Sequence, residues 1–176
     1  NTVLPIFIYD TNITNKLEKN DHRLKFISDT ITDMNSKLHS TNNKIFTFKG
    51  KPSEVLSQLI KKYKIKAIFF NKDYEPYATR RDNCINKLFV KNSISFKGFK
   101  DQVIFEQDEV TKNDGKPYVV YTPYSRKWIE KFSKENVKDY RSEDLLNSLT
   151  EMDFFDHDDI ILNFSKNTIN PPELHF

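Results

Sequence analysis

Four short apolar runs alternate with segments of helical periodicity through residues 1–100, and this alternation restricts the possible folds most strongly. The runs span residues 3–9, 44–49, 66–71 and 93–99. Continuous apolar runs of this length are typical of strands that are buried on both faces. Strands that alternate with helices favour right-handed crossovers and a parallel sheet. We therefore predict an α/β fold with a doubly wound, mostly parallel Rossmann-like sheet and helices on both faces.

The segments between these runs carry apolar residues at the spacing of amphipathic helices. A helix over residues 21–40 is predicted by one stripe, formed by Leu24, Ile27, Ile31, Met34 and Leu38. Two further helices are predicted to begin at Pro52 and Pro76, because proline suits the first helical turn. The inner face of the helix after Pro52 is expected to hold Val55, Leu56, Leu59, Ile60 and Tyr63. That of the helix after Pro76 is expected to hold Cys84, Ile85, Leu88 and Phe89.

Polar residues and a glycine follow the first three runs. Asp10 ends the first run, Gly50 ends the second, and a polar loop over residues 71–75 follows the third. The carboxyl ends of parallel strands meet at one edge of the sheet, where α/β folds bind their ligands. The sequence therefore predicts a ligand crevice at this edge.

Composition narrows the functions that remain. The chain has 176 residues, enough for one domain, and its 15 Phe and 8 Tyr supply a large apolar area. Only three glycines are present, which argues against a glycine-rich phosphate loop. The net charge of +3 is too small to indicate nucleic-acid binding. The single cysteine fits a reducing compartment, and no signal peptide or long apolar span is visible, so we expect a cytoplasmic protein.

The sequence shows no pattern of a catalytic or metal-binding site. The histidines lack metal-site spacing to a cysteine or to one another; they are His22, His39, His157 and His175. The acidic run at residues 156–159 is more typical of a solvated linker than of a cation site. No serine-nucleophile motif is present. We therefore predict no catalytic residue and no metal ligand in this chain.

The periodic pattern loosens after about residue 133. A short amphipathic helix is predicted over residues 138–147, and the segment that follows has no clear period. We expect an α/β domain over residues 1–133 and a tail, similar to an interdomain linker, over residues 134–176.

Four stretches resemble, in order and spacing, the amino-terminal α/β domain of the DNA photolyase and cryptochrome family. The first stretch is GKPYVVYTPYSRKW (115–128), which is similar to the family's G-x-P-Y-x-V-[YF]-[ST]-P-[FY] run. It predicts a Gly turn, a β-like run and a helix that Thr122 caps and Pro123 begins. FFNKDYEPYATRRD (69–82) is similar to the family's [DY]-x-E-P-Y…R-D run. The others are VLPIFIYD with DHRLKFI, and KPSEVLSQLIKKYKI.

This resemblance implies that the chain is a piece of a flavin-dependent deoxyribodipyrimidine photolyase, a lyase that uses light to split pyrimidine dimers in DNA. In the family, a first strand precedes the equivalent of Val3 in the middle of the sheet. A carboxy-terminal helical domain holds FAD and the damaged DNA, so the implied partners are that domain and, through it, DNA. We expect a monomer that binds no membrane.

In the family, the amino-terminal domain often holds an antenna pigment. The positions that match the flavin-type pigment site, or end the first strand of this chain, are Ile8, Tyr9, Arg23, Asp73, Tyr74 and Glu75. Carboxylates would accept hydrogen bonds from the pigment ring, and the arginine would pair with a phosphate or carboxylate. The resemblance implies a deazaflavin or flavin mononucleotide. Folate is disfavoured, because Tyr77 and Ala78 replace the family's Asn-Glu pair.

Other interpretations remain open. Many family members hold no pigment, and Asp73 and Glu75 are equally consistent with caps of the helix after Pro76. Arg23 is compatible with an acidic neighbour on its own helix. Four aromatic residues are expected in the core rather than at a pigment: Phe69, Phe70, Phe89 and Trp128. Two other functions are a cryptochrome-like photoreceptor without repair activity, and a stand-alone nucleotide-binding module, which would require a phosphate-binding Gly run.

Overall fold

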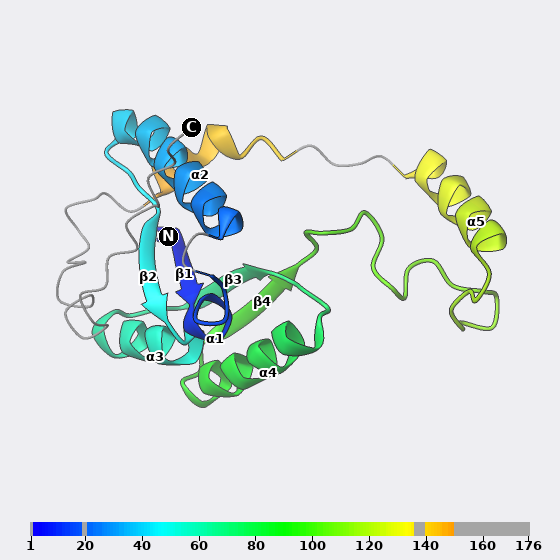
Figure 1. The fold of residues 1–176 in the computed structure, drawn as a ribbon, viewed down its shortest axis with the longest axis horizontal. Helices are drawn as coiled ribbons and strands as arrows, with labels where there is room; N and C mark the ends of the chain where they lie inside the picture. Colours follow the sequence, from blue (N-terminus) through cyan, green and yellow to red (C-terminus); the bar gives the residue numbers. More distant parts are fainter. Residues whose placement is uncertain (1, 19–20, 136–139, 150–176) are drawn as a thin grey trace. The chain divides into compact units, whose positions relative to one another are not determined.

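The computed structural model describes residues 2–18, 21–135 and 140–149 (Figure 1). The chain divides into two compact units: unit 1 comprises residues 1–65 and 141–176, and unit 2 comprises residues 66–140. Each unit contains one two-stranded parallel sheet with helices between its strands in sequence. The predicted α/β class with parallel strands is confirmed, and the strands described here pair as two small sheets.

Unit 1 holds the first two strands. Its elements are β1 (Ile6–Asp10), α1 (Thr11–Thr14), α2 (His22–Leu38), η1 (His39–Thr41), β2 (Phe46–Gly50), α3 (Pro52–Lys62) and η2 (Ser142–Ser148). β1 and β2 pair in parallel, with Ile6 opposite Phe46 and Asp10 opposite Gly50. Both strands end at the predicted polar residue or glycine. Asp10 also begins α1, because its carboxylate accepts a hydrogen bond from the Asn12 N–H at 2.9 Å.

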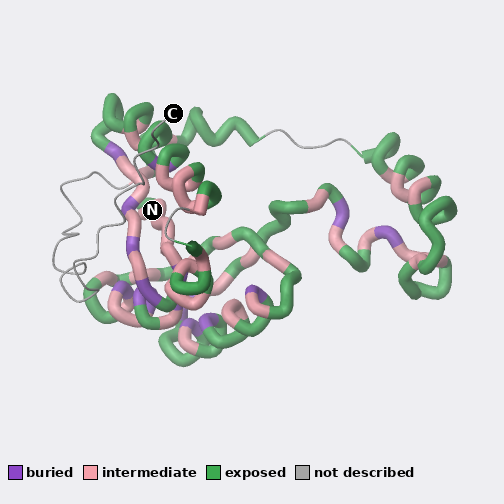
Figure 2. Tube along the Cα trace, viewed as in Figure 1, coloured by how far each residue is buried: buried purple, intermediate pink, exposed green. Residues whose placement is uncertain are grey.

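The core of unit 1 lies between β2 and α3. Phe46 and Phe48 alternate with half-buried residues along β2, as expected for a strand with one fully covered face. α3 begins at Pro52, as predicted, and packs against both β1 and β2. Its Val55 and Leu59 are fully buried. Figure 2 shows this concentration of buried residues along β2 and α3.

α2 begins at the predicted position but buries less than its stripe indicates. Asp21 caps it, since Oδ1 accepts a hydrogen bond from the Arg23 N–H at 2.9 Å. Asn35 joins the helix to the segment just before β2 by accepting a hydrogen bond from the Ile45 N–H at 2.7 Å. Ile31 is its buried residue, whereas Met34 is exposed. The apolar spacing therefore predicted the helix correctly and the burial of Met34 wrongly.

Unit 2 holds the other two strands. Its elements are β3 (Ala67–Asn71), α4 (Pro76–Lys91), β4 (Ser95–Phe99) and α5 (Tyr121–Lys134). β3 and β4 pair in parallel, with Ala67 opposite Ser95 and Asn71 opposite Phe99. α4 packs against β4 and buries Ala78, Ile85 and Phe89.

Two core predictions in unit 2 are wrong. Cys84 is exposed, because it precedes Ile85 by one position, about 100° around the helix from the buried stripe. Phe69 is 61% exposed, because its side chain leaves β3 on the face opposite to those of Ile68 and Phe70. Phe89 is fully buried as predicted, and Phe70 is half-buried.

The start of α5 also differs from the prediction. The helix begins at Tyr121 with Val120 as its cap, so Thr122 and Pro123 lie inside the first turn. This is tolerated because the first N–H groups of a helix have no intrahelical acceptor, so Pro123 removes no hydrogen bond. Gly115 forms the expected turn, with φ of 77°. Residues 116–120 form no strand, so the predicted β-like run is wrong.

The chain after α5 includes a short 3-10 helix over Ser142–Ser148 instead of the amphipathic helix predicted over residues 138–147. The Val3 N–H donates a hydrogen bond to the Ser148 carbonyl at 2.8 Å, and Val3 forms a parallel bridge with Leu149. The acidic run at residues 156–159 lies outside the described residues.

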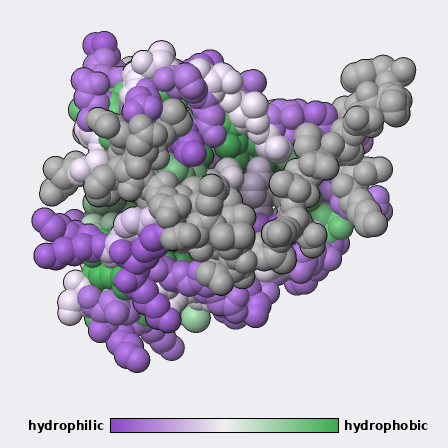
Figure 3. Space-filling view, turned by 90° about the vertical axis from the view of Figure 1, so that its left-hand side faces the viewer, coloured by the Kyte–Doolittle hydropathy of each residue, from purple (hydrophilic) through white to green (hydrophobic). Residues whose placement is uncertain are grey.

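The outer surface is mostly polar on the face that Figure 3 shows, where hydrophilic residues surround smaller hydrophobic patches. Across the described residues, no helix combines the length and the apolar character that a membrane crossing requires.

Candidate ligand site at the strand ends

The end of β1 presents Ile8 and Tyr9, both half-buried. The Tyr9 ring packs edge-on against Phe7, with ring centroids 4.9 Å apart. Burial raises the pKa of the Tyr9 phenol, and a hydrogen bond with Ser28 of α2 opposes this shift. Tyr9 is therefore a neutral, partly apolar group with a hydroxyl that faces α2.

Arg23 lies in the first turn of α2 and pairs with Asp21. Its Nη2 is 2.6 Å from Asp21 Oδ2, and its Nε donates to Oδ1 at 2.9 Å. The guanidinium lowers the pKa of the Asp21 carboxyl to about 2, mainly through this hydrogen bond. The alternative interpretation, that Arg23 pairs with an acidic neighbour, is thus confirmed. Arg23 nevertheless remains 74% exposed, with two of its five N–H donors used on Asp21.

The loop between β3 and α4 carries the remaining predicted residues. Asp73 Oδ1 accepts a hydrogen bond from the Glu75 N–H at 2.9 Å, which closes a tight turn before α4. Glu75 occupies the cap position of α4, but its carboxylate makes no capping hydrogen bond and is exposed. The carboxylate of Asp73 therefore has a structural role in the turn, while that of Glu75 has no part in capping.

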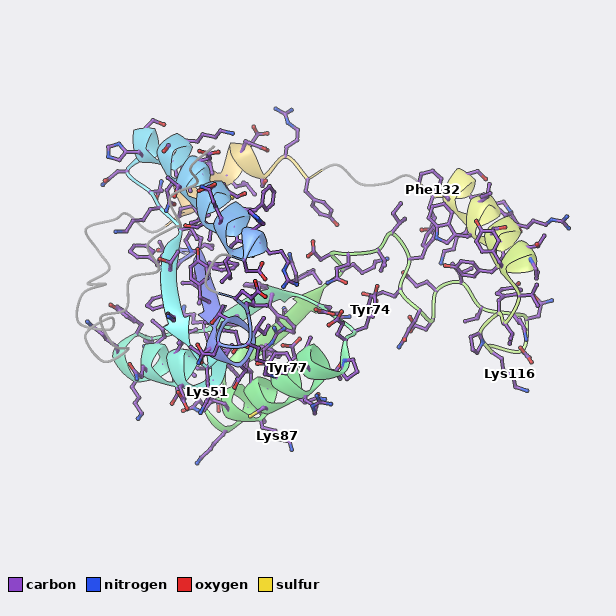
Figure 4. The ribbon with its side chains drawn as sticks, in the orientation of Figure 1. Lys51, Tyr74, Tyr77, Lys87, Lys116 and Phe132 are labelled. Atoms are coloured by element: carbon purple, nitrogen blue, oxygen red, sulfur yellow. The ribbon has the colours of Figure 1, made fainter. Side chains whose placement is uncertain are left out.

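A cavity of about 370 Å³ opens beside the carboxyl end of β3, within unit 2, and reaches Phe96 near the start of β4. Asp73 and Tyr74 contribute to its lining, together with residues of α4 and of the loop at 106–108. Figure 4 labels Tyr74 in the loop before α4 and Tyr77 in the first turn of that helix. The cavity includes part of the 71–75 loop but neither Asp10 nor Gly50, so a crevice along the whole edge stays a prediction.

The six predicted ligand residues divide equally between the two units. Asp73 and Tyr74 line one cavity, and Glu75 follows them in the chain. Ile8, Tyr9 and Arg23 belong to unit 1. A joint site formed by all six residues stays a prediction. The position that would carry the folate-type Glu is occupied by Ala78, which is buried against the core.

Sequence reasoning missed most of the residues that line the cavity. The polar residues of α4 that face it recur at helical spacing: Thr79, Asp82, Asn83 and Asn86. This polar stripe lies beside the buried stripe of Ala78, Ile85 and Phe89 and was visible in the sequence. The loop at 106–108 carries no comparable signal.

Comparisons with known proteins agree with this architecture. A family model described as DNA photolyase matches residues 1–142. The deoxyribodipyrimidine photo-lyase of Alkalihalophilus pseudofirmus is 30% identical over 102 residues, which are 57% of this chain and 21% of the relative. The enzyme of the same name from Synechococcus is 21% identical over 126 residues, 72% of this chain and 26% of the relative. Rat cryptochrome-1 is 22% identical over 159 residues, 90% of this chain and 27% of the relative.

Two solved structures share the fold. The archaeal photolyase from Sulfolobus tokodaii, described with two FAD molecules, matches with a TM-score of 0.64 and 22% identity over 95% of this chain and 36% of its own. The class III photolyase from Agrobacterium tumefaciens matches with a TM-score of 0.62 and 19% identity over 72% of this chain and 26% of its own.

The chain spans about a quarter of the length of these curated relatives. The family model, in contrast, matches residues 1–142, well over half of this chain. The chain belongs to the DNA photolyase family.

Proposed function

We propose that this chain is the amino-terminal antenna and scaffold domain of a flavin-dependent deoxyribodipyrimidine photolyase that repairs pyrimidine dimers in DNA with light. The family match over residues 1–142 carries the proposal, and two curated relatives with the photolyase name support it. The FAD and the bond chemistry would belong to a carboxy-terminal helical domain outside this sequence. The α/β domain would span residues 1–133 and act in the cytoplasm as part of a monomer.

We assign the proposed pigment contacts to Ile8, Tyr9, Arg23, Asp73, Tyr74 and Glu75. The exposed Glu75 carboxylate, which makes no cap, fits an acceptor for a ring N–H. Arg23 retains donors for a phosphate or carboxylate beyond those that bind Asp21. These groups fit a deazaflavin or flavin mononucleotide, which would supply light absorption, while the protein residues orient it. The two-FAD description of the Sulfolobus tokodaii relative supports a flavin-type pigment.

The pigment assignment is tested on the full-length protein by its absorption spectrum after denaturation. We expect a second chromophore besides FAD, and we expect Glu75→Ala and Arg23→Ala to lower its occupancy. Lys127→Ala on α5, which removes an exposed pair with Glu130 away from the strand ends, serves as the matched control. Release of FAD alone would refute the pigment, and unchanged occupancy in both variants would refute the residue assignments.

A cryptochrome-like photoreceptor is the second candidate, because rat cryptochrome-1 matches 90% of this chain. The two functions differ in whether illumination repairs DNA. We expect the full-length protein to restore a dimer-containing oligonucleotide under blue light and to leave it unchanged in the dark. A protein that binds FAD and responds to light without repairing the oligonucleotide would favour the photoreceptor.

A further inference from the structure

The cavity beside the carboxyl end of β3 has an aromatic floor. The Phe70 and Phe96 rings stack with centroids 4.2 Å apart and planes inclined by 21°. Gly98 makes room for this arrangement, because a Cβ at that position would lie 2.8 Å from both Phe70 Cζ and Lys72 Cγ. The missing side chain at Gly98 therefore lets an aromatic face line the cavity.

The walls of the cavity are polar. The α4 stripe of Thr79, Asp82, Asn83 and Asn86 lines it together with the loop residues Glu106, Gln107 and Asp108. Within the described part of the chain, the side chains of Asn83, Asn86 and Asp108 form no hydrogen bond with another residue. Their amide and carboxylate oxygens are therefore available to a bound molecule.

The charge of the lining is predominantly negative. Four carboxylates and one ammonium contribute to it: Asp73, Asp82, Glu106, Asp108 and Lys72. Asp82 is partly compensated by Arg81, whose Nε donates to it at 2.8 Å. A concave site lined by one sign of charge concentrates ions of the opposite sign. The cavity therefore disfavours a phosphate or carboxylate ligand and favours a cation.

The arrangement fits an organic cation better than a metal ion. Among the described residues, no group of three His, Cys, Asp or Glu side chains is close enough to hold a metal. Phe96 is stacked between Phe70 and Phe89, so the π face available to a ligand is the outer face of Phe70, which attracts a cation as well as the flat side of a ring. The volume of about 370 Å³ lies within the range of about 300–1,000 Å³ found for small-molecule sites.

We propose that this cavity binds a planar organic cation. Its ring lies against the face of Phe70 that is turned away from Phe96, and its N–H groups donate to Asp108, Asn83 and Asn86. The site shares Asp73 and Tyr74 with the proposed pigment site. The two ligands differ in charge, because the pigment's phosphate or carboxylate requires a cationic partner, whereas this cavity is lined mainly by carboxylates. The proposal does not depend on the proposed photolyase function, because all of its residues lie within unit 2.

Calorimetric titration of the 176-residue chain with two matched probes tests the proposal. The probes are 2-aminobenzimidazole, at a pH where its ring is protonated, and the neutral 2-hydroxybenzimidazole of the same size. We expect the cation to bind about tenfold more tightly than the neutral probe, a difference that the added charge attraction can supply. Equal affinities, or no binding of the cation, would overturn the proposal.

Three variants locate the binding. The double variant Glu106→Gln with Asp108→Asn removes two charges at nearly constant shape, so we expect it to abolish the preference for the cation. Gly98→Ala pushes the Phe70 ring or Lys72 from its place and should weaken both probes. Asp114→Asn, an exposed carboxylate outside the cavity, should change neither affinity. A double variant that keeps its fold by circular dichroism and still prefers the cation would contradict the assignment.

Discussion

Single residues in this chain often have two roles that the sequence cannot separate. Asp21 caps α2 and binds Arg23, whereas Asp73 closes a turn and lines a cavity. The sequence identified Arg23, Asp73 and Glu75 as polar groups near strand or helix ends. It could not show which oxygen or N–H each side chain would meet, because that depends on side-chain rotamers and on neighbours from other elements.

Asp21→Ala should lower the thermal stability of the chain at neutral pH, because it removes both the cap and the pair with Arg23. Asp21→Asn keeps a capping oxygen and should lose less. The folded-state pKa of about 2 lies below the ordinary value of 3.8, so the ionised carboxylate stabilises the fold above about pH 4, and this contribution is lost as the pH falls toward 2.

The measurement is the difference in Tm between the native chain and Asp21→Ala, followed by circular dichroism as the pH falls. We expect this difference to shrink between about pH 4 and pH 2. Asp29→Ala, which removes the exposed pair with Lys25 on the same helix, is the control and should have a small effect throughout. A pH-independent difference for Asp21→Ala would show that ionisation of Asp21 does not stabilise the fold, because both the cap and the pair with Arg23 favour the ionised carboxylate.

At the scale of elements, periodicity predicted the strands and helices well and their exposure poorly. α2, α3 and α4 begin at or next to the predicted residues, because local caps and prolines fix helix starts. Exposure of Cys84, Phe69 and Met34 depends instead on which face of an element another element covers. Which face is covered depends on tertiary packing, and a local sequence pattern does not contain that information.

Phe89→Ala should destabilise unit 2 by about 3–5 kcal/mol, the usual cost of removing a buried phenyl ring. The side chain is fully buried between α4 and β4, with its ring centroid 5.6 Å from that of Phe96. Val90→Ala, at a neighbouring position that is 68% exposed, should change the free energy of unfolding by less than about 0.5 kcal/mol. Urea denaturation of both variants checks this, and similar midpoints would contradict the burial of Phe89.

At the scale of the whole molecule, unit 1 combines segments from both parts of the sequence. Val3, before β1, pairs with Ser148 and Leu149, which follow η2. The sequence predicted the α/β class, since that class follows from element order. It did not predict the pairing of Val3 with Leu149, because a single bridge between residues so far apart in sequence leaves no periodic signal.

A chain that ends at residue 140 should lose the protection of the Val3 amide against hydrogen exchange, because its acceptor is the Ser148 carbonyl. A chain that ends at residue 149 retains this acceptor and should keep the protection. The Phe70 amide of β3 in unit 2 serves as an internal reference and should exchange equally in both chains. Equal exchange of Val3 in both would show that this bridge does not form in solution.

The exposure of Cys84 gives this chain one convenient chemical handle. It is the only thiol among the 176 residues, and it directly follows Asn83 of the cavity wall on α4. A maleimide dye would therefore attach at a single known position without any engineered cysteine. Its emission would respond to a molecule entering next to Asn83, so one labelled sample could screen a compound collection by fluorescence.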